Sequence, residues 1–130
     1  MKNFFEQPID DEMFKELLVG GSPWMVSWSI LEKEFTKKGT QEIHFAFNED
    51  KTGLSGWFSR ISDKRIRPGP MKDIFVEEGR VSFISVVTGT MYNYSLMRDG
   101  TLNGFFIGAS PRKYSFIGNS IAQPARLRPA

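Results

Sequence analysis

His44 is the only histidine in this sequence, and no cysteine accompanies it. It follows the alternation of a β-strand and shares a face with Glu42 and Ala46. If that face lined a cavity, the imidazole would suit a general base, because its ordinary pKa lies near neutrality. A lone histidine without cysteines lacks the ligands of a zinc site, so no metal is expected. The alternative role, a surface or hydrogen-bonded structural histidine, stays open.

Aromatic side chains are the second group that could form a site. Tyr92 and Tyr94 are two residues apart and would share one strand face with Leu96. Tyrosine and tryptophan combine a large apolar surface with one polar group, which suits a ligand cavity as well as a core. In an enzyme, His44 and Tyr94 would be the catalytic candidates, with Arg60 as a further polar group. The candidate ligand-binding residues are Trp28, Trp57, Tyr92, Tyr94 and Phe106.

The sequence lacks the motifs and residues of several other kinds of site. It has no nucleophile elbow, phosphate loop, dinucleotide fingerprint or calcium loop, so no cofactor is expected. The absence of cysteine excludes disulfides and thiol nucleophiles. The N-terminus has acids and Pro8 in place of the apolar core of a signal peptide, and no stretch is long enough to span a membrane. We therefore expect a cytoplasmic protein that does not bind membranes.

The net charge of +2 is spread unevenly along the chain. Acidic residues outnumber basic ones in the first twenty residues, whereas all the charged residues among the last twenty are basic. Nucleic-acid binding would need basic residues on one face, interleaved with exposed aromatics. We interpret the basic residues of this sequence as ordinary solvated charges, and we expect no nucleic-acid partner. The basic residues concerned are Lys64, Arg65, Arg67, Arg112, Lys113, Arg126 and Arg128.

The elements that position these residues begin with one predicted helix at residues 9–19. Its apolar residues recur at helical spacing, Asp10 is a suitable N-cap, and Gly20-Gly21 supplies the stop. A helix this short needs to dock its apolar face on the rest of the fold. The apolar residues are Ile9, Met13, Phe14, Leu17 and Leu18.

Period-2 alternation then predicts eight strands between residues 23 and 121. Lys37-Lys38-Gly39 is the first predicted turn, and a three-strand meander covers residues 80–107. Within the meander, Asp99-Gly100 has the composition of a type I′ hairpin turn, in which both central residues have positive φ. Strand four is predicted at 72–77, strand eight at 113–121, and an extended basic tail at 122–130.

Two glycine-containing segments resemble each other, at residues 52–58 and 100–106. Each has a leucine, then a glycine two residues later (Gly56 and Gly104), then two aromatics. Glycine inside a strand marks a bend or a close approach of two backbones. We interpret the similarity as a repeated structural feature rather than a duplicated site.

The pattern favours an all-β single domain, an eight-stranded antiparallel up-and-down barrel with a short N-terminal helix. Closure removes exposed strand edges, and a barrel of this size is filled by side chains or holds one small ligand. A two-sheet sandwich is the alternative. Several strands are apolar on both faces, which predicts a homodimer or a larger homo-oligomer.

The layout resembles the calycin superfamily of lipocalin-like and avidin-like barrels. Gly21-Ser22-Pro23-Trp24 is similar to the lipocalin Gly-x-Trp opening with one extra residue, and Leu54-Ser55-Gly56-Trp57 resembles an avidin Leu-x-Gly-aromatic strand. The lipocalin Thr-Asp-Tyr motif and the avidin Asn/Ser/Tyr biotin site are missing. The resemblance implies a small apolar ligand in the barrel without naming it.

Three functions follow as hypotheses. The first is binding of a small, mostly hydrophobic molecule in the barrel cavity. The second is a cofactor-free cyclase, isomerase or lyase that uses the same cavity. The third is an interaction or regulatory module whose barrel is simply packed.

Overall fold

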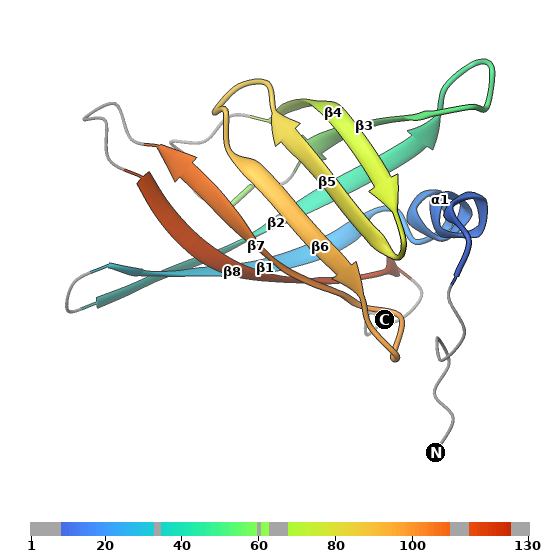
Figure 1. Cartoon of the computed structure of the whole chain (residues 1–130). Coiled ribbons are helices and arrows are strands. Elements are labelled where there is room, and N and C mark those ends of the chain that lie inside the picture. Colours follow the sequence, from blue (N-terminus) through green and yellow to red (C-terminus); the bar gives the residue numbers. More distant parts are fainter. Residues whose placement is uncertain (1–8, 33–34, 60, 63–67, 110–114, 126–130) are drawn as a thin grey trace.

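The computed structural model describes residues 9–32, 35–59, 61–62, 68–109 and 115–125. Within these residues the chain forms one helix, α1 (Asp11–Gly20), and a closed barrel of eight antiparallel strands (Figure 1). Each strand pairs with the next, and β8 pairs back to β1. The predicted barrel with its N-terminal helix is confirmed, and the structure is not the two-sheet sandwich. The strands are β1 (Trp24–Glu32), β2 (Phe35–Phe47), β3 (Leu54–Ser59), β4 (Gly69–Glu77), β5 (Arg80–Ser85), β6 (Met91–Leu96), β7 (Leu102–Ala109) and β8 (Ser115–Gln123).

Helix α1 begins and ends at the predicted signals. The Asp10 carboxylate accepts a hydrogen bond from the Met13 amide at 2.7 Å, which satisfies one free N–H of the first turn, and Gly21 is the C-cap. The apolar residues divide between two surroundings: Phe14 and Leu18 are fully buried in the core, whereas Met13 is 54% exposed. Burial of two such side chains contributes roughly 3–6 kcal/mol, which holds this short helix in place.

Polar contacts fix α1 across one end of the barrel (Figure 1). The Asp11 carboxylate accepts from the Glu78 amide at 3.0 Å in the β4–β5 turn. The Lys15 ammonium donates to the Thr52 carbonyl at 3.2 Å in the β2–β3 turn. The helix therefore spans this end between two turns that are far apart in sequence.

The predicted turn at Lys37-Lys38-Gly39 is wrong. These residues belong to β2, where Lys38 pairs with Ser29 and Gly39 pairs with Trp28. A Cβ atom on Gly39 would lie 2.5 Å from a Trp28 ring carbon, so this glycine makes room for the indole. Its local composition looks like a turn, but its role is to allow packing across the strand pair.

The turn geometry of the meander also differs from the expectation. Gly100 has φ of 86°, but Asp99 is not at positive φ, and Met97 N donates to Thr101 O at 2.8 Å across the loop 98–100. This is a longer loop with one left-handed glycine rather than a type I′ turn. The paired positive φ values of a type I′ turn occur instead at Glu78 (51°) and Gly79 (77°).

Two strand limits are corrected as well. β4 begins at Gly69, three residues before the predicted start at Lys72, and its register with β5 shifts between Lys72 and Phe75. Such a bulge bends the strand, and Asp73 within it has φ of 54°. β8 continues to Gln123, so the predicted tail at 122–130 begins too early; residues 126–130 lie outside the described residues.

Within the described part of the chain, no helix is long and apolar enough to cross a membrane.

Candidate functional site

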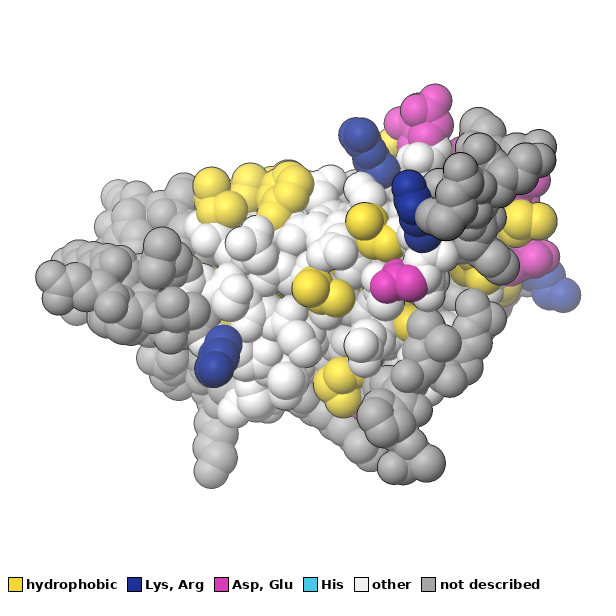
Figure 2. Space-filling model, turned by 90° about the horizontal axis from the view of Figure 1, so that it is seen from below, with side chains coloured by type: hydrophobic (Ala, Val, Ile, Leu, Met, Phe, Trp, Pro, Cys, Tyr) yellow, Lys and Arg dark blue, Asp and Glu magenta, His cyan; other side chains and the backbone are white. Residues whose placement is uncertain are grey.

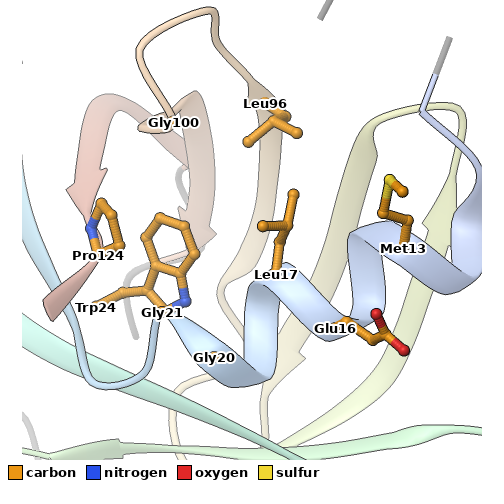
Figure 3. Close-up of a pocket in the computed structure, with 9 residues that line it drawn as sticks. All are labelled: Met13, Glu16, Leu17, Gly20, Gly21, Trp24, Leu96, Gly100 and Pro124. Atoms are coloured by element: carbon orange, nitrogen blue, oxygen red, sulfur yellow. The ribbon is translucent and has the colours of Figure 1, made fainter. Parts of the chain in front are cut away.

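A pocket of about 210 Å³ opens between α1 and the adjoining end of the barrel (Figure 3). The indole of Trp24 lies on one side of it and the side chains of Leu17 and Leu96 approach from two others (Figure 3). These residues come from the helix, from the start of β1 and from the end of β6. The complete lining is Met13, Glu16, Leu17, Gly20, Gly21, Trp24, Leu96, Gly100 and Pro124.

The helix end and Trp24 form a rigid floor for this pocket. The Trp24 indole N–H donates to the Leu18 carbonyl at 2.8 Å, which satisfies a free carbonyl of the last helical turn and fixes the ring. A Cβ atom on Gly21 would lie 2.6 Å from the indole and 3.0 Å from Pro124, so only glycine allows this packing. The Ala125 amide donates to the Gly21 carbonyl at 2.8 Å and holds Pro124 in position.

A serine joins the same helix end to β2. The Ser22 hydroxyl accepts from the Phe45 amide at 2.8 Å and donates to the Leu18 carbonyl at 2.9 Å. Ser22 lies between the C-cap Gly21 and the first residue of β1, Trp24. These two hydrogen bonds therefore fix the direction in which the chain leaves the helix and begins β1.

The opposite rim of the pocket is the β6–β7 loop. Asp99 accepts two hydrogen bonds from Thr101, at 2.6 Å from the hydroxyl and 3.0 Å from the amide. The hydrogen bonds from the Thr101 hydroxyl, the larger cause, and from its amide lower the pKa of the Asp99 carboxyl, because both favour the ionised form. Gly100, which has no side chain, is the loop residue that faces the pocket.

The pocket is apolar with one charge. Glu16 is the only ionisable residue of the lining, and Leu17, Leu96, Trp24, Pro124 and Met13 supply the apolar surface. A cavity of about 150 Å³ lined by aliphatic and aromatic side chains binds benzene in another protein, so a single ring or a branched alkyl group fits a pocket of this size.

Four of the five predicted ligand-binding residues lie inside the barrel, where they pack against one another. Tyr92 stacks on Phe83 at 5.2 Å between ring centroids and contacts Phe106 at 5.8 Å. Trp28 meets Phe106 edge-on at 6.1 Å. The structure thus brings Trp28, Tyr92, Tyr94 and Phe106 together inside the barrel, in contact with one another.

Tyr94, a predicted catalytic residue, is only 1% exposed. Its hydroxyl bonds to the Ser120 hydroxyl at 2.6 Å. Burial raises the pKa of the Tyr94 phenol well above its ordinary value, and the bond to Ser120 offsets this only in part. A phenol held neutral and already bonded is a poor proton donor or acceptor near pH 7, so the geometry does not support a catalytic role.

Trp57 does not face the interior, so its predicted place among the ligand-binding residues of the cavity is wrong. His44 does not face the interior either, which agrees with the alternative of a hydrogen-bonded structural histidine. Trp57 is 42% exposed on the outer wall, and the His44 ring stacks on it at 4.9 Å between centroids. The His44 Nε2 atom bonds to the Ser59 hydroxyl at 2.9 Å. Cross-strand partners point to the same side of a sheet, and Trp57 is the partner of His44. Arg60 lies outside the described residues.

Sequence reasoning did not find the pocket itself. Met13 and Leu17 are one turn apart on α1, on a different side from the buried pair Phe14 and Leu18. Met13 and Leu17 were among the apolar residues of the predicted helix, but their spacing is also that of an ordinary core-facing stripe, so it did not indicate a pocket. Pro124 gave no signal, since its place beside Trp24 depends on barrel closure.

Among the residues that the structure describes, no group of three or more histidine, cysteine, aspartate or glutamate side chains could hold a metal ion. No protein-family model, curated protein or solved structure matches this chain.

Proposed function

We propose that this protein binds a small, mostly hydrophobic molecule in the pocket between α1 and the barrel end. The observation that carries the proposal is the pocket of about 210 Å³ with Trp24, Leu17 and Leu96 around it. This keeps the ligand class expected from the sequence and moves the site from the barrel interior to its helix end. Membership of the calycin superfamily and a cytoplasmic location stay proposals, the first supported by the closed eight-stranded barrel.

The size of the pocket limits the affinity. A ligand of about ten non-hydrogen atoms that gains on the order of 0.3–0.6 kcal/mol per atom binds with about 3–6 kcal/mol. That corresponds to a dissociation constant between roughly millimolar and tens of micromolar. We therefore expect a molecule that exchanges rapidly rather than one that stays bound through purification.

The enzymatic alternative has less support. The two residues proposed to carry it, His44 and Tyr94, lie on the outer wall and in a hydrogen-bonded core position, respectively. Neither lines the pocket. A cofactor-free reaction would therefore need other groups, and Glu16 is the only ionisable residue at the pocket.

A filled pocket tests the proposal. Gly20 lines the pocket and a Cβ atom built on it meets nothing within 4 Å, so Gly20→Leu adds an isobutyl group at the pocket with no clash at its first atom. Saturation-transfer NMR with toluene and indole as probes is expected to show binding to the wild type and at least tenfold weaker binding to Gly20→Leu. Ser55→Leu is the control, because it adds the same side chain to an exposed position of β3. Equal binding to Gly20→Leu and the wild type would contradict this site.

A further inference from the structure

On four adjacent strands of the barrel, the described outward-facing side chains carry no charge. The described outward-facing side chains of β6, β7, β8 and β1 are all apolar, serine, asparagine or glutamine. The outward-facing side chains of β2, β4 and β5 include Lys38, Lys72, Glu77 and Arg80. A typical soluble surface has about 25–35% charged residues, so a charge-free wall of four adjacent strands is a marked depletion. Depletion of charge is also the compositional signal of an interface core.

Large apolar side chains are exposed on this wall in a regular arrangement. Met91, Ile107 and Ile117 are cross-strand neighbours and form one row across β6, β7 and β8. Phe105 lies in the next row, between Asn93 and Asn119, and Ile121 lies in the row after that, opposite Asn103; both are exposed. Figure 2 views the molecule from the side of β1, β7 and β8: separate hydrophobic side chains lie over a mostly uncharged surface, and charged ones gather mainly toward the α1 end. We name the described outward-facing surface of β6, β7, β8 and β1, which includes these five residues, the apolar wall.

We propose that the apolar wall binds a second copy of this chain, face to face, in a reversible homodimer. In a two-fold dimer each surface meets its own image, so any excess of one charge would repel itself. This wall has none. The polar residues between the apolar side chains, Asn93, Asn103 and Asn119, carry both donors and acceptors, so each amide can pair with the same group on another copy.

A second copy also fits better than a membrane or a charged partner. Interfacial membrane binding is strengthened by lysine and arginine near the apolar surface, and the described side chains of this wall include neither. A partner recognised by charge would have no charged group to pair with among the described outward-facing side chains of these four strands.

The dimensions of the wall predict a weak dimer. Four strands about 4.8 Å apart, with five to seven residues at about 3.4 Å each, cover roughly 350 Å² in projection. Two copies would then cover about 700 Å², below the standard interface of about 1,600 Å². Interfaces at this low end are transient, so we expect a dissociation constant of tens of micromolar or weaker.

Sedimentation equilibrium of the full chain over a range of concentrations tests the proposal. The wild type is expected to pass from monomer to dimer as the concentration rises, and Ile107→Lys to remain monomeric. Phe75→Lys is the matched control, because Phe75 is exposed on β4 outside the wall and its change should leave the equilibrium unaltered.

Asn119→Asp and Asn119→Lys separate a lost interface from a lost fold, because Asn119 is exposed and charge there does not disturb the core. Each alone should dimerise at least tenfold more weakly than the wild type, whereas an equimolar mixture should recover dimer. A wild type that stays monomeric at millimolar concentration, or dimers unaffected by all three wall variants, would overturn the proposal. A monomer that instead co-sediments with neutral phosphatidylcholine vesicles would overturn it in favour of a membrane-binding face.

Discussion

Gly104 in β7 is the position at which the barrel tolerates least change. A Cβ atom built on it would overlap the Asn93 carbonyl oxygen and lie 2.8 Å from the Tyr94 Cα atom, both in the backbone of β6. Carbon atoms in contact are ordinarily about 3.5–4.0 Å apart. Gly104→Ala therefore forces β6 and β7 apart, because a backbone carbonyl cannot turn away as a flexible side chain can.

The cost follows from what the separation disrupts. Gly104 pairs with Tyr94, and the neighbouring pair is Asn93 with Phe105. Loss of about two backbone hydrogen bonds contributes roughly 2 kcal/mol. Displacement of the buried Tyr94 ring adds about 1–3 kcal/mol. The expected loss is roughly 3–5 kcal/mol, which is a large part of the total stability of about 5–15 kcal/mol of a typical domain.

Urea unfolding followed by circular dichroism measures this loss against two controls. At Gly56 an added Cβ would lie 2.6 Å from the mobile Met71 sulfur and 2.8 Å from the His44 carbonyl, so Gly56→Ala should cost less than Gly104→Ala. Gly20→Ala meets nothing within 4 Å and should be neutral or stabilising by about 0.5–1 kcal/mol, because alanine favours helix. If Gly104→Ala stayed within 1 kcal/mol of the wild type, the close approach of β6 and β7 would be refuted.

Two further predictions concern buried hydrogen bonds. Tyr94→Phe leaves the Ser120 hydroxyl without its 2.6 Å partner and should cost about 1–3 kcal/mol at pH 7 in urea unfolding. Burial raises the pKa of Tyr94 in the folded state, so its contribution to the free energy of unfolding is full below the unfolded-state pKa of about 10 and is lost as the pH rises above it. The difference in the free energy of unfolding between Tyr94→Phe and the wild type should therefore shrink at pH 11. A difference that stays constant would contradict the burial of Tyr94. Ser22→Ala removes the acceptor of the Phe45 amide and should cost about 1–3 kcal/mol, with faster hydrogen exchange at that amide; unchanged exchange would show that another group bonds it.

Much of the fold could be predicted because its signals are local. Alternating apolar residues gave the number and order of the strands, and Asp10 with Gly20-Gly21 gave the helix. Both glycines of the repeated segment do lie at close backbone approaches, as expected. The error at Lys37-Lys38-Gly39 arose because Gly39 accommodates the Trp28 ring, a contact between strands that local composition does not encode.

The site was harder to predict because it depends on contacts between distant segments. Leu17 on α1, Leu96 at the end of β6 and Pro124 just after β8 come from three segments that meet only when the barrel closes. Alternation correctly placed Tyr92 and Tyr94 on one strand face, but it could not tell which face of a strand points into the barrel. Trp57 and Phe58 are both large and hydrophobic, so hydrophobicity alone does not decide which of them is buried. The structure buries Phe58, which is only 4% exposed.

The three tryptophans of the chain lie in three different parts of the barrel, so each can report on a ligand bound near it. Trp24 borders the pocket, Trp28 lies in the barrel interior and Trp57 is exposed on the outer wall. A titration of the ¹⁵N-labelled protein with indole, followed by the three side-chain indole N–H signals, therefore reports the binding place directly. Signals would be assigned with Trp28→Phe and Trp57→Phe. The account predicts saturable shifts of the Trp24 signal with little change in the other two, whereas shifts confined to Trp28 or Trp57 would contradict it.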